Sequence, residues 1–210
     1  MDTNKLYQRA LWFAQFVVIY NVVEGIVSMI LGYQDESLTL FGFGMDSAIE
    51  VASNLGVIYM IKRIQRNPNS DRAPFEKRAL KITGYGFYLL SLSLLIGIVL
   101  NLIQGHKPVN TFFGVIISVI SIFVMAFVVY NQLQTGKKLN SAPIIADAKC
   151  TMVCLYMSVV LLMASGIYYL TGFGYIDSLG ALGLIYFSVK EGKESLEKAN
   201  SNKLCSCEDD

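Results

Sequence analysis

Six long apolar stretches constrain the fold of this chain more than any other feature. A helix needs about 20 mainly apolar residues to cross a bilayer core of about 30 Å. The stretches cover residues 10–32, 38–61, 82–102, 112–133, 144–170 and 178–189 of a chain of 210 residues. They leave little of the chain for a soluble domain. The sequence therefore predicts an all-α membrane protein, built as a six-transmembrane-helix bundle.

Composition supports this interpretation and argues against a soluble domain and against a nucleic-acid-binding protein. Hydrophobic residues make up 54% of the chain and charged residues only 16%, whereas globular chains carry about 25% charged residues. The formal net charge is +1, so there is no basic excess with which to bind the phosphates of a nucleic acid. We therefore expect a lipid bilayer around the chain and no nucleic-acid partner.

The basic residues predict the orientation of the bundle. Of the 17 lysines and arginines, 15 lie before the first stretch, between the second and third, between the fourth and fifth, or after the sixth. Such residues stay in the cytoplasm, so both termini are expected to be cytoplasmic. We expect residues 1–198 to form the transmembrane domain and residues 199–210 a short acidic cytoplasmic tail. The expected location is a plasma membrane, the inner membrane in a bacterium.

Ionisable and thiol side chains inside the stretches predict where the functional region lies. A charged side chain near the bilayer centre costs about 2.5 kcal/mol or more on insertion scales, so it is rarely placed there without a role. The second stretch contains Asp46 and Glu50, and the fifth contains Cys150 and Cys154. Residues four apart share one face of a helix. Each pair therefore forms one polar stripe.

The two stripes together favour a metal site near mid-membrane. At about 1.5 Å per residue, Glu50 and Cys154 both fall near the middle of their helices. Because these helices run antiparallel, we expect Asp46 to face Cys154 and Glu50 to face Cys150. Two oxygens and two sulfurs would then surround one ion tetrahedrally, which is the geometry that zinc prefers.

Simpler interpretations of these residues stay open. A cysteine in an apolar helix is usually a small hydrophobic side chain, and a carboxylate pair can relay protons or hold a helix through hydrogen bonds. Asn21 and Glu24 in the first stretch and Asp147 near the start of the fifth are candidates for an accessory or proton-relay role. Glu24 fits a structural hydrogen bond equally well.

The tail carries a second pair of thiols. Cys205 and Cys207 stand beside three acidic residues at the end of the chain. Thiolates and carboxylates together can collect a soft cation, so the pair is a candidate for metal capture. A mobile acidic tail with incidental thiols is the alternative.

Four motifs, in order along the chain, resemble the transmembrane domain of a cation diffusion facilitator, a family of six-helix metal–proton antiporters. They are Asn21-Val-Val-Glu-Gly25, Asp46-Ser-Ala-Ile-Glu50, Ala146-Asp-Ala-Lys-Cys150 and Asp177-Ser-Leu-Gly-Ala-Leu-Gly183. The resemblance covers nearly the whole chain. The family places its transport site on the second and fifth helices, typically as an Asp/His-xxx-Asp pair and a His-xxx-Asp pair. By position, the resemblance implies four metal ligands: Asp46, Glu50, Cys150 and Cys154.

Two departures from the family pattern change what the resemblance implies. Cys-xxx-Cys stands where the family has His-xxx-Asp, and thiolates favour zinc, cadmium, copper(I) or mercury over manganese and magnesium. Only about 20 residues follow the sixth stretch, so we do not expect the cytoplasmic metal-binding domain of the family. A homodimer, if the chain forms one, is then expected to assemble through the transmembrane helices.

The resemblance implies a secondary transporter rather than an enzyme. It would export a soft or borderline metal cation, with zinc the first expectation, in exchange for protons. The metal ion and the protons are substrates, and no cofactor is expected. Metal binding would release protons and returning protons would expel the metal, while the bundle alternates around a midplane site. A metal-binding receptor or scaffold without transport, a membrane thiol oxidoreductase and a channel stay open as alternatives.

Overall fold

Six α-helices make up nearly all of the part of the chain that the structure describes. The computed structural model describes residues 3–67, 74–104, 108–109, 111–139, 142–173 and 175–200, apart from a few side chains within the helices. The helices are α1 Thr3–Gln34, α2 Leu38–Arg66, α3 Pro74–Gln104, α4 Phe112–Leu139, α5 Ala142–Thr171 and α6 Tyr175–Asn200. The expected all-α bundle of six helices is confirmed. Each helix is longer than the apolar stretch from which it was predicted.

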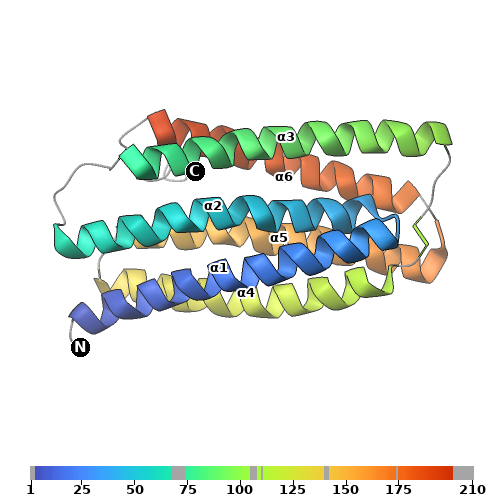
Figure 1. The fold of residues 1–210 in the computed structure, drawn as a ribbon. Helices are drawn as coiled ribbons and strands as arrows, with labels where there is room; N and C mark the ends of the chain where they lie inside the picture. Colours follow the sequence, from blue (N-terminus) through green and yellow to red (C-terminus); the bar gives the residue numbers. More distant parts are fainter. Residues whose placement is uncertain are drawn as a thin grey trace.

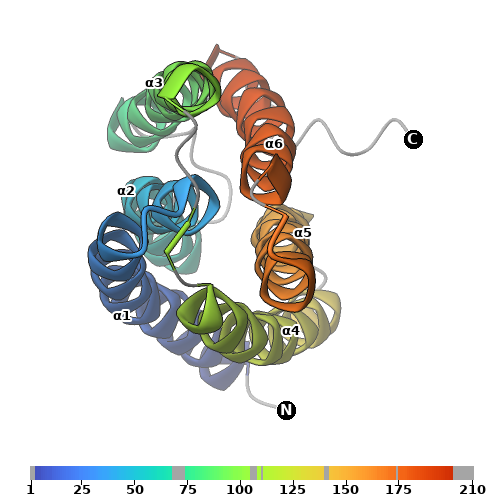
Figure 2. The ribbon, with the colours of Figure 1, turned by 90° about the vertical axis from the view of Figure 1, so that its right-hand side faces the viewer.

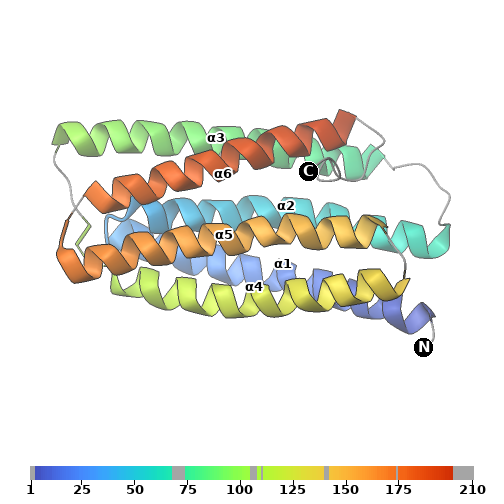
Figure 3. The same cartoon turned by 180° about the vertical axis from the view of Figure 1, so that it is seen from behind.

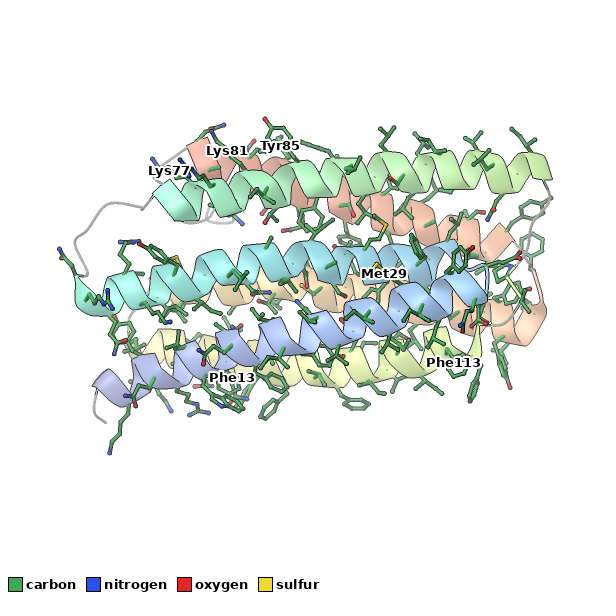
Figure 4. All side chains as sticks on the ribbon, in the orientation of Figure 1. Phe13, Met29, Lys77, Lys81, Tyr85 and Phe113 are labelled. Carbon is green, nitrogen blue, oxygen red and sulfur yellow. The ribbon has the colours of Figure 1, made fainter. Side chains whose placement is uncertain are left out.

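Consecutive helices run antiparallel along a common axis (Figure 1). The N-terminus of α1 and the C-terminus of α6 lie at the same end of the bundle, where α2 also ends and α3 begins. Lys77 and Lys81 lie at this end, whereas Phe113 lies near the other (Figure 4). Because basic residues are retained on the cytoplasmic side of membranes, we expect this end to be cytoplasmic and call it the cytoplasmic end. The opposite end is called the outer end.

Four of the described helices contain segments that are long and apolar enough to cross a membrane. These segments are Lys5–Gln34, Leu80–Ile103, Phe112–Leu139 and Thr151–Thr171. They belong to α1, α3, α4 and α5, and α2 and α6 run beside them. Large apolar side chains such as Ile19, Leu89 and Phe123 are exposed on the outside of the bundle. Such a surface is suited to contact with lipid.

Helices α3 and α6 form a pair beside the other four helices, as the view along the bundle shows (Figure 2). The backbones approach closely where Gly84 of α3 meets α6, because a Cβ atom at Gly84 would lie 3.0 Å from the carbonyl oxygen of Gly192. Small residues allow such an approach between membrane helices. Helices α2 and α5 face each other across the interior of the bundle.

A cluster of buried apolar side chains fills the outer half of the bundle between α2, α3, α5 and α6. This outer apolar cluster consists of Leu40, Phe43, Phe87, Leu90, Leu94, Ile98, Met157, Leu161, Ala181 and Leu184. Its α2 residues precede Asp46, and its α5 residues follow Cys154. The cluster therefore packs on the outer side of the polar residues and sets the depth at which they lie.

Asp177 at the start of α6 links the outer ends of α2 and α6 through hydrogen bonds. Its carboxylate accepts hydrogen bonds from Ser37 Oγ at 2.7 Å and from the backbone N–H of Leu38 at 2.8 Å. Thr39 Oγ1 in turn donates to the Asp177 carbonyl oxygen at 2.6 Å. The first N–H groups of a helix have no partner within that helix. Asp177 therefore caps α2 from a different helix.

Replacing Asp177 with alanine is expected to destabilise the bundle. The change removes a buried charged acceptor from the N-terminus of α2, which costs about 2–3 kcal/mol. For a chain of this size, that corresponds to a fall of roughly 5–10 °C in Tm. Thermal unfolding of purified protein in detergent measures it.

Asp35→Ala is the matched control, because Asp35 lies at the same end and its buried Oδ2 atom has no hydrogen-bond partner. Its Tm is expected to stay within about 2 °C of the parent. Equal losses of stability in the two variants would show that the cap contributes nothing specific.

Candidate functional site

The structure brings Glu50 of α2 and Cys154 of α5 into direct contact. The Cys154 thiol donates a hydrogen bond to Glu50 Oε1. Cys154 is buried and Glu50 is half-buried. Asp46, one turn away on α2, is 1% exposed. Three of the four predicted ligands therefore lie in the interior where α2 and α5 face each other.

The expected pairing between the two stripes is wrong by one helical turn. We expected Cys154 to face Asp46, but its thiol contacts Glu50. The outer end of α5 extends beyond the start of α2 (Figure 3), and the order of residues along two antiparallel helices does not by itself fix which of them lie at the same height. The depth estimate, which put Glu50 and Cys154 both near the middle of their helices, agrees with the observed contact.

The side chains of Cys150 and Asp147 lie outside the described part of α5. Their backbone is helical, so both residues belong to the element that carries Cys154. Whether Cys150 completes a four-ligand site with Asp46, Glu50 and Cys154 stays a prediction. Among the side chains that the structure describes, no group of three or more metal-binding residues is arranged to hold a metal ion.

Asn21 of α1 holds the second oxygen of Glu50. Its Nδ2 atom donates a hydrogen bond to Glu50 Oε2 at 3.0 Å, and Asn21 is fully buried. With the Cys154 thiol on Oε1, both carboxylate oxygens of Glu50 have a donor. A residue that orients a metal ligand in this way tunes how strongly the ligand binds. Asn21 was predicted only as an accessory residue. Its hydrogen bond shows that Glu50 is the side chain of the site that it contacts.

Glu24 of α1 forms a second hydrogen-bonded group beside the site. Tyr20 donates to Glu24 Oε1 at 2.8 Å, and Ser47 of α2 donates to Glu24 Oε2 at 3.0 Å. Glu24 is also close enough to Asp46 and Glu50 to interact with them electrostatically. The contacts fit both readings of Glu24 that the sequence left open, a proton relay and a structural hydrogen bond.

The acids of the site have no basic partner among the side chains that the structure describes. Within the described residues, Asp46 and Glu50 form no ion pair with a lysine or an arginine. Asp46 Oδ1 is buried and lacks a hydrogen-bond partner. A buried oxygen in this condition is costly, and a bound proton or cation removes the cost. The arrangement is therefore chemically suited to exchange between protons and a positively charged ion.

Glu191 of α6 is a buried acid that the sequence analysis missed. It is 8% exposed and lies close enough to Asp46, Glu50 and Cys154 for electrostatic interaction. The signal was present in the sequence as an acid just beyond the sixth apolar stretch. Because Lys190 and Lys193 flank it, the segment resembled an ordinary interfacial end of a helix.

The outer apolar cluster separates the site from the outer end of the bundle. The polar residues Glu50 and Glu191 lie on the cytoplasmic side of that cluster. A second apolar cluster, Ala10, Ala14, Ile61 and Ile144, packs α1, α2 and α5 together near the cytoplasmic end. The tail cysteines Cys205 and Cys207 lie outside the described residues.

Comparisons with known proteins agree with this architecture. The family described as the cation efflux transmembrane domain matches residues 14–201. An uncharacterized transporter of Methanocaldococcus jannaschii is 27% identical over 161 residues, which cover 72% of this chain and 57% of that protein. The chain thus spans somewhat more than half of the length of this relative. The family match confirms the resemblance found in the sequence motifs, and the chain belongs to the cation efflux family of membrane transporters.

Proposed function

We propose that this chain exports a soft or borderline metal cation, zinc first among them, from the cytoplasm in exchange for protons. The contact between Cys154 and Glu50 is the observation that carries the proposal. Thiolate and carboxylate are both zinc ligands, and here they meet across the α2–α5 interface inside the bundle. The family match supports transport of a cation. The choice of metal and the coupling to protons rest on the chemistry of the side chains.

The proton between Cys154 and Glu50 explains how metal and proton movements are linked. A thiol binds metal as thiolate, so the proton that it now donates to Glu50 Oε1 must leave when a metal ion binds. When protons return, the thiol forms again and the metal loses its sulfur ligand. Asp46 would take part in the same exchange, because its unpaired Oδ1 atom gains a partner from either a metal ion or a proton.

The remaining predicted residues have accessory roles in this proposal. Asn21 orients Glu50, and Glu24 with Tyr20 and Ser47 passes protons to or from Asp46. Cys150 supplies the fourth ligand. Asp147, near the cytoplasmic end of α5, draws the cation toward the site. Beyond the last helix, Cys205 and Cys207 collect the metal before it reaches the bundle.

Cys154→Ala is expected to abolish zinc uptake into proteoliposomes. A four-ligand zinc site supplies about 10–16 kcal/mol, so losing one ligand costs about 3 kcal/mol, on the order of 100-fold in affinity. Entrapped zinc-sensitive dye measures uptake, and titration calorimetry in detergent measures affinity. Met157→Leu is the control, because Met157 is buried one turn away on α5 in the outer apolar cluster. Undiminished uptake by Cys154→Ala would overturn the assigned site. If the parent protein binds zinc but does not transport it, the chain acts as a metal-binding receptor instead.

Asn21→Ala is expected to weaken zinc binding about tenfold while transport continues. The change removes the amide that orients Glu50 but leaves every proposed ligand in place. Ser28→Ala is the matched control on the same face of α1, because Ser28 is fully buried and its Oγ has no hydrogen-bond partner. If both variants bind zinc like the parent protein, Asn21 does not tune the site.

Cys154→Asp is expected to change which metal is preferred. The substitution restores the residue type that the family typically has at this position and exchanges a soft sulfur ligand for a hard oxygen. The ratio of cadmium to zinc uptake should fall several-fold, whereas zinc uptake itself should persist. Competition between the two metals in proteoliposomes measures the ratio. An unchanged ratio would mean that Cys154 does not contact the transported ion.

A further inference from the structure

Glu191 is buried on the interior face of α6, and the proposed zinc site does not use it. The residue is 8% exposed, and its Oε1 atom is buried without a hydrogen-bond partner. Lys190, Glu194 and Lys198 are close enough to act on it electrostatically, but Lys198 forms its ion pair with Glu194 at 3.6 Å. Burying the Glu191 carboxylate costs free energy. The structure describes no hydrogen bond to Oε1 that offsets this cost.

Two other unpartnered oxygens lie at the same region of the bundle. Ser188 is three residues before Glu191, on the same face of α6, and its Oγ atom is fully buried without a partner. Thr83 of α3 is 1% exposed, and its Oγ1 atom also has no partner. Gly84 beside Thr83 packs against the Gly192 backbone, next in sequence to Glu191. Three oxygens without hydrogen-bond partners therefore lie close to the place where α3 and α6 pack together.

Within this group, Glu191 lies on the cytoplasmic side of Glu50. Asp177 contacts the backbone N–H of Leu38, which fixes α6 and α2 at equal height there. Glu191 is 14 residues beyond Asp177 and Glu50 is 12 beyond Leu38, so Glu191 lies about 3 Å deeper toward the cytoplasm. Toward that end, α6 diverges from α2 (Figure 1). An ion that arrives from the cytoplasm along α6 meets Glu191 first.

We propose that Glu191, together with the hydroxyl groups of Ser188 and Thr83, forms an oxygen-lined site that holds a divalent cation in transit between the cytoplasm and Glu50. The site gives each of the three orphaned oxygens a partner. Oxygen ligands bind hard divalent ions and bind zinc more weakly than thiolate does. Weak binding suits a transit site, which has to release its ion to the next one. The transit role rests on the proposed function, whereas the presence of a cation site does not.

The transport test compares Glu191→Gln with the parent protein in proteoliposomes whose cytoplasmic face is supplied with zinc. The variant keeps the size of the side chain but loses its charge. We expect KM for zinc to rise on the order of tenfold with little change in the maximal rate, because Glu50 and Cys154 are intact. Glu197→Gln is the matched control, since Glu197 lies on the same helix, is half exposed and forms an ion pair with Lys193 at the surface. An unchanged KM for Glu191→Gln would overturn the transit role.

The binding test uses manganese, which prefers oxygen ligands to sulfur. Electron paramagnetic resonance of the purified protein titrated with Mn²⁺ should show a weak site that Glu191→Gln loses and Cys154→Ala retains. Glu191→Asp keeps the charge and should retain manganese, which guards against a variant that merely fails to fold. Manganese binding that does not depend on Glu191 would overturn the site itself. Absent zinc flux in the parent protein would instead overturn the proposed function, while the manganese titration still decides whether Glu191 holds a cation.

Discussion

The hydrogen bond between the Cys154 thiol and the Glu50 carboxylate is the interaction on which the rest of this structure depends. It joins α2 to α5 in the interior of the bundle, next to the outer apolar cluster. Hydrogen-bond donors lower the cost of burying a carboxylate there, and Asn21 supplies the second donor to Glu50. Thiol, carboxylate and amide therefore form one hydrogen-bonded set, and the proposed function has a metal ion replace the thiol proton in it.

The two ends of the bundle are built differently around this set. At the outer end, the apolar cluster and the Asp177 cap hold α2, α3, α5 and α6 together. Toward the cytoplasmic end, α6 stays packed on α3, and the interior acquires unpartnered oxygens from Thr83, Ser188 and Glu191. A transporter that alternates between two sides needs one closed side and one polar side. Between α2, α3, α5 and α6, apolar residues lie toward the outer end and unpartnered polar residues toward the cytoplasmic end. Helices α1, α2 and α5 also meet through apolar residues near the cytoplasmic end.

Much of the fold was predictable because membrane helices follow simple rules. The apolar stretches indicated six helices, and the lysines and arginines indicated which end is cytoplasmic. The faces of α2 and α5 that meet were predictable from the four-residue spacing of Asp46 with Glu50 and of Cys150 with Cys154. That spacing defines a face but not a height, so it could not reveal that Cys154 meets Glu50 rather than Asp46.

Contacts between helices distant in sequence were beyond such rules. The capping of α2 by Asp177 depends on how the start of α6 meets α2 in space, and no local pattern encodes it. The sequence pattern did not reveal Glu191 as part of the interior, for a different reason. Basic neighbours made its segment resemble an interfacial helix end, whereas packing of α6 on α3 through Gly84 and Gly192 turns Glu191 inward. Packing therefore decides which charges belong to the site.

The central claim is that metal and protons occupy the same ligands by turns. The most direct test is to load proteoliposomes with a pH-sensitive dye, add zinc outside with no imposed pH gradient, and record the internal pH as zinc enters. Zinc influx is expected to drive protons out, so that the interior becomes more alkaline in proportion to the zinc taken up. Zinc influx with no change of internal pH would contradict the claim.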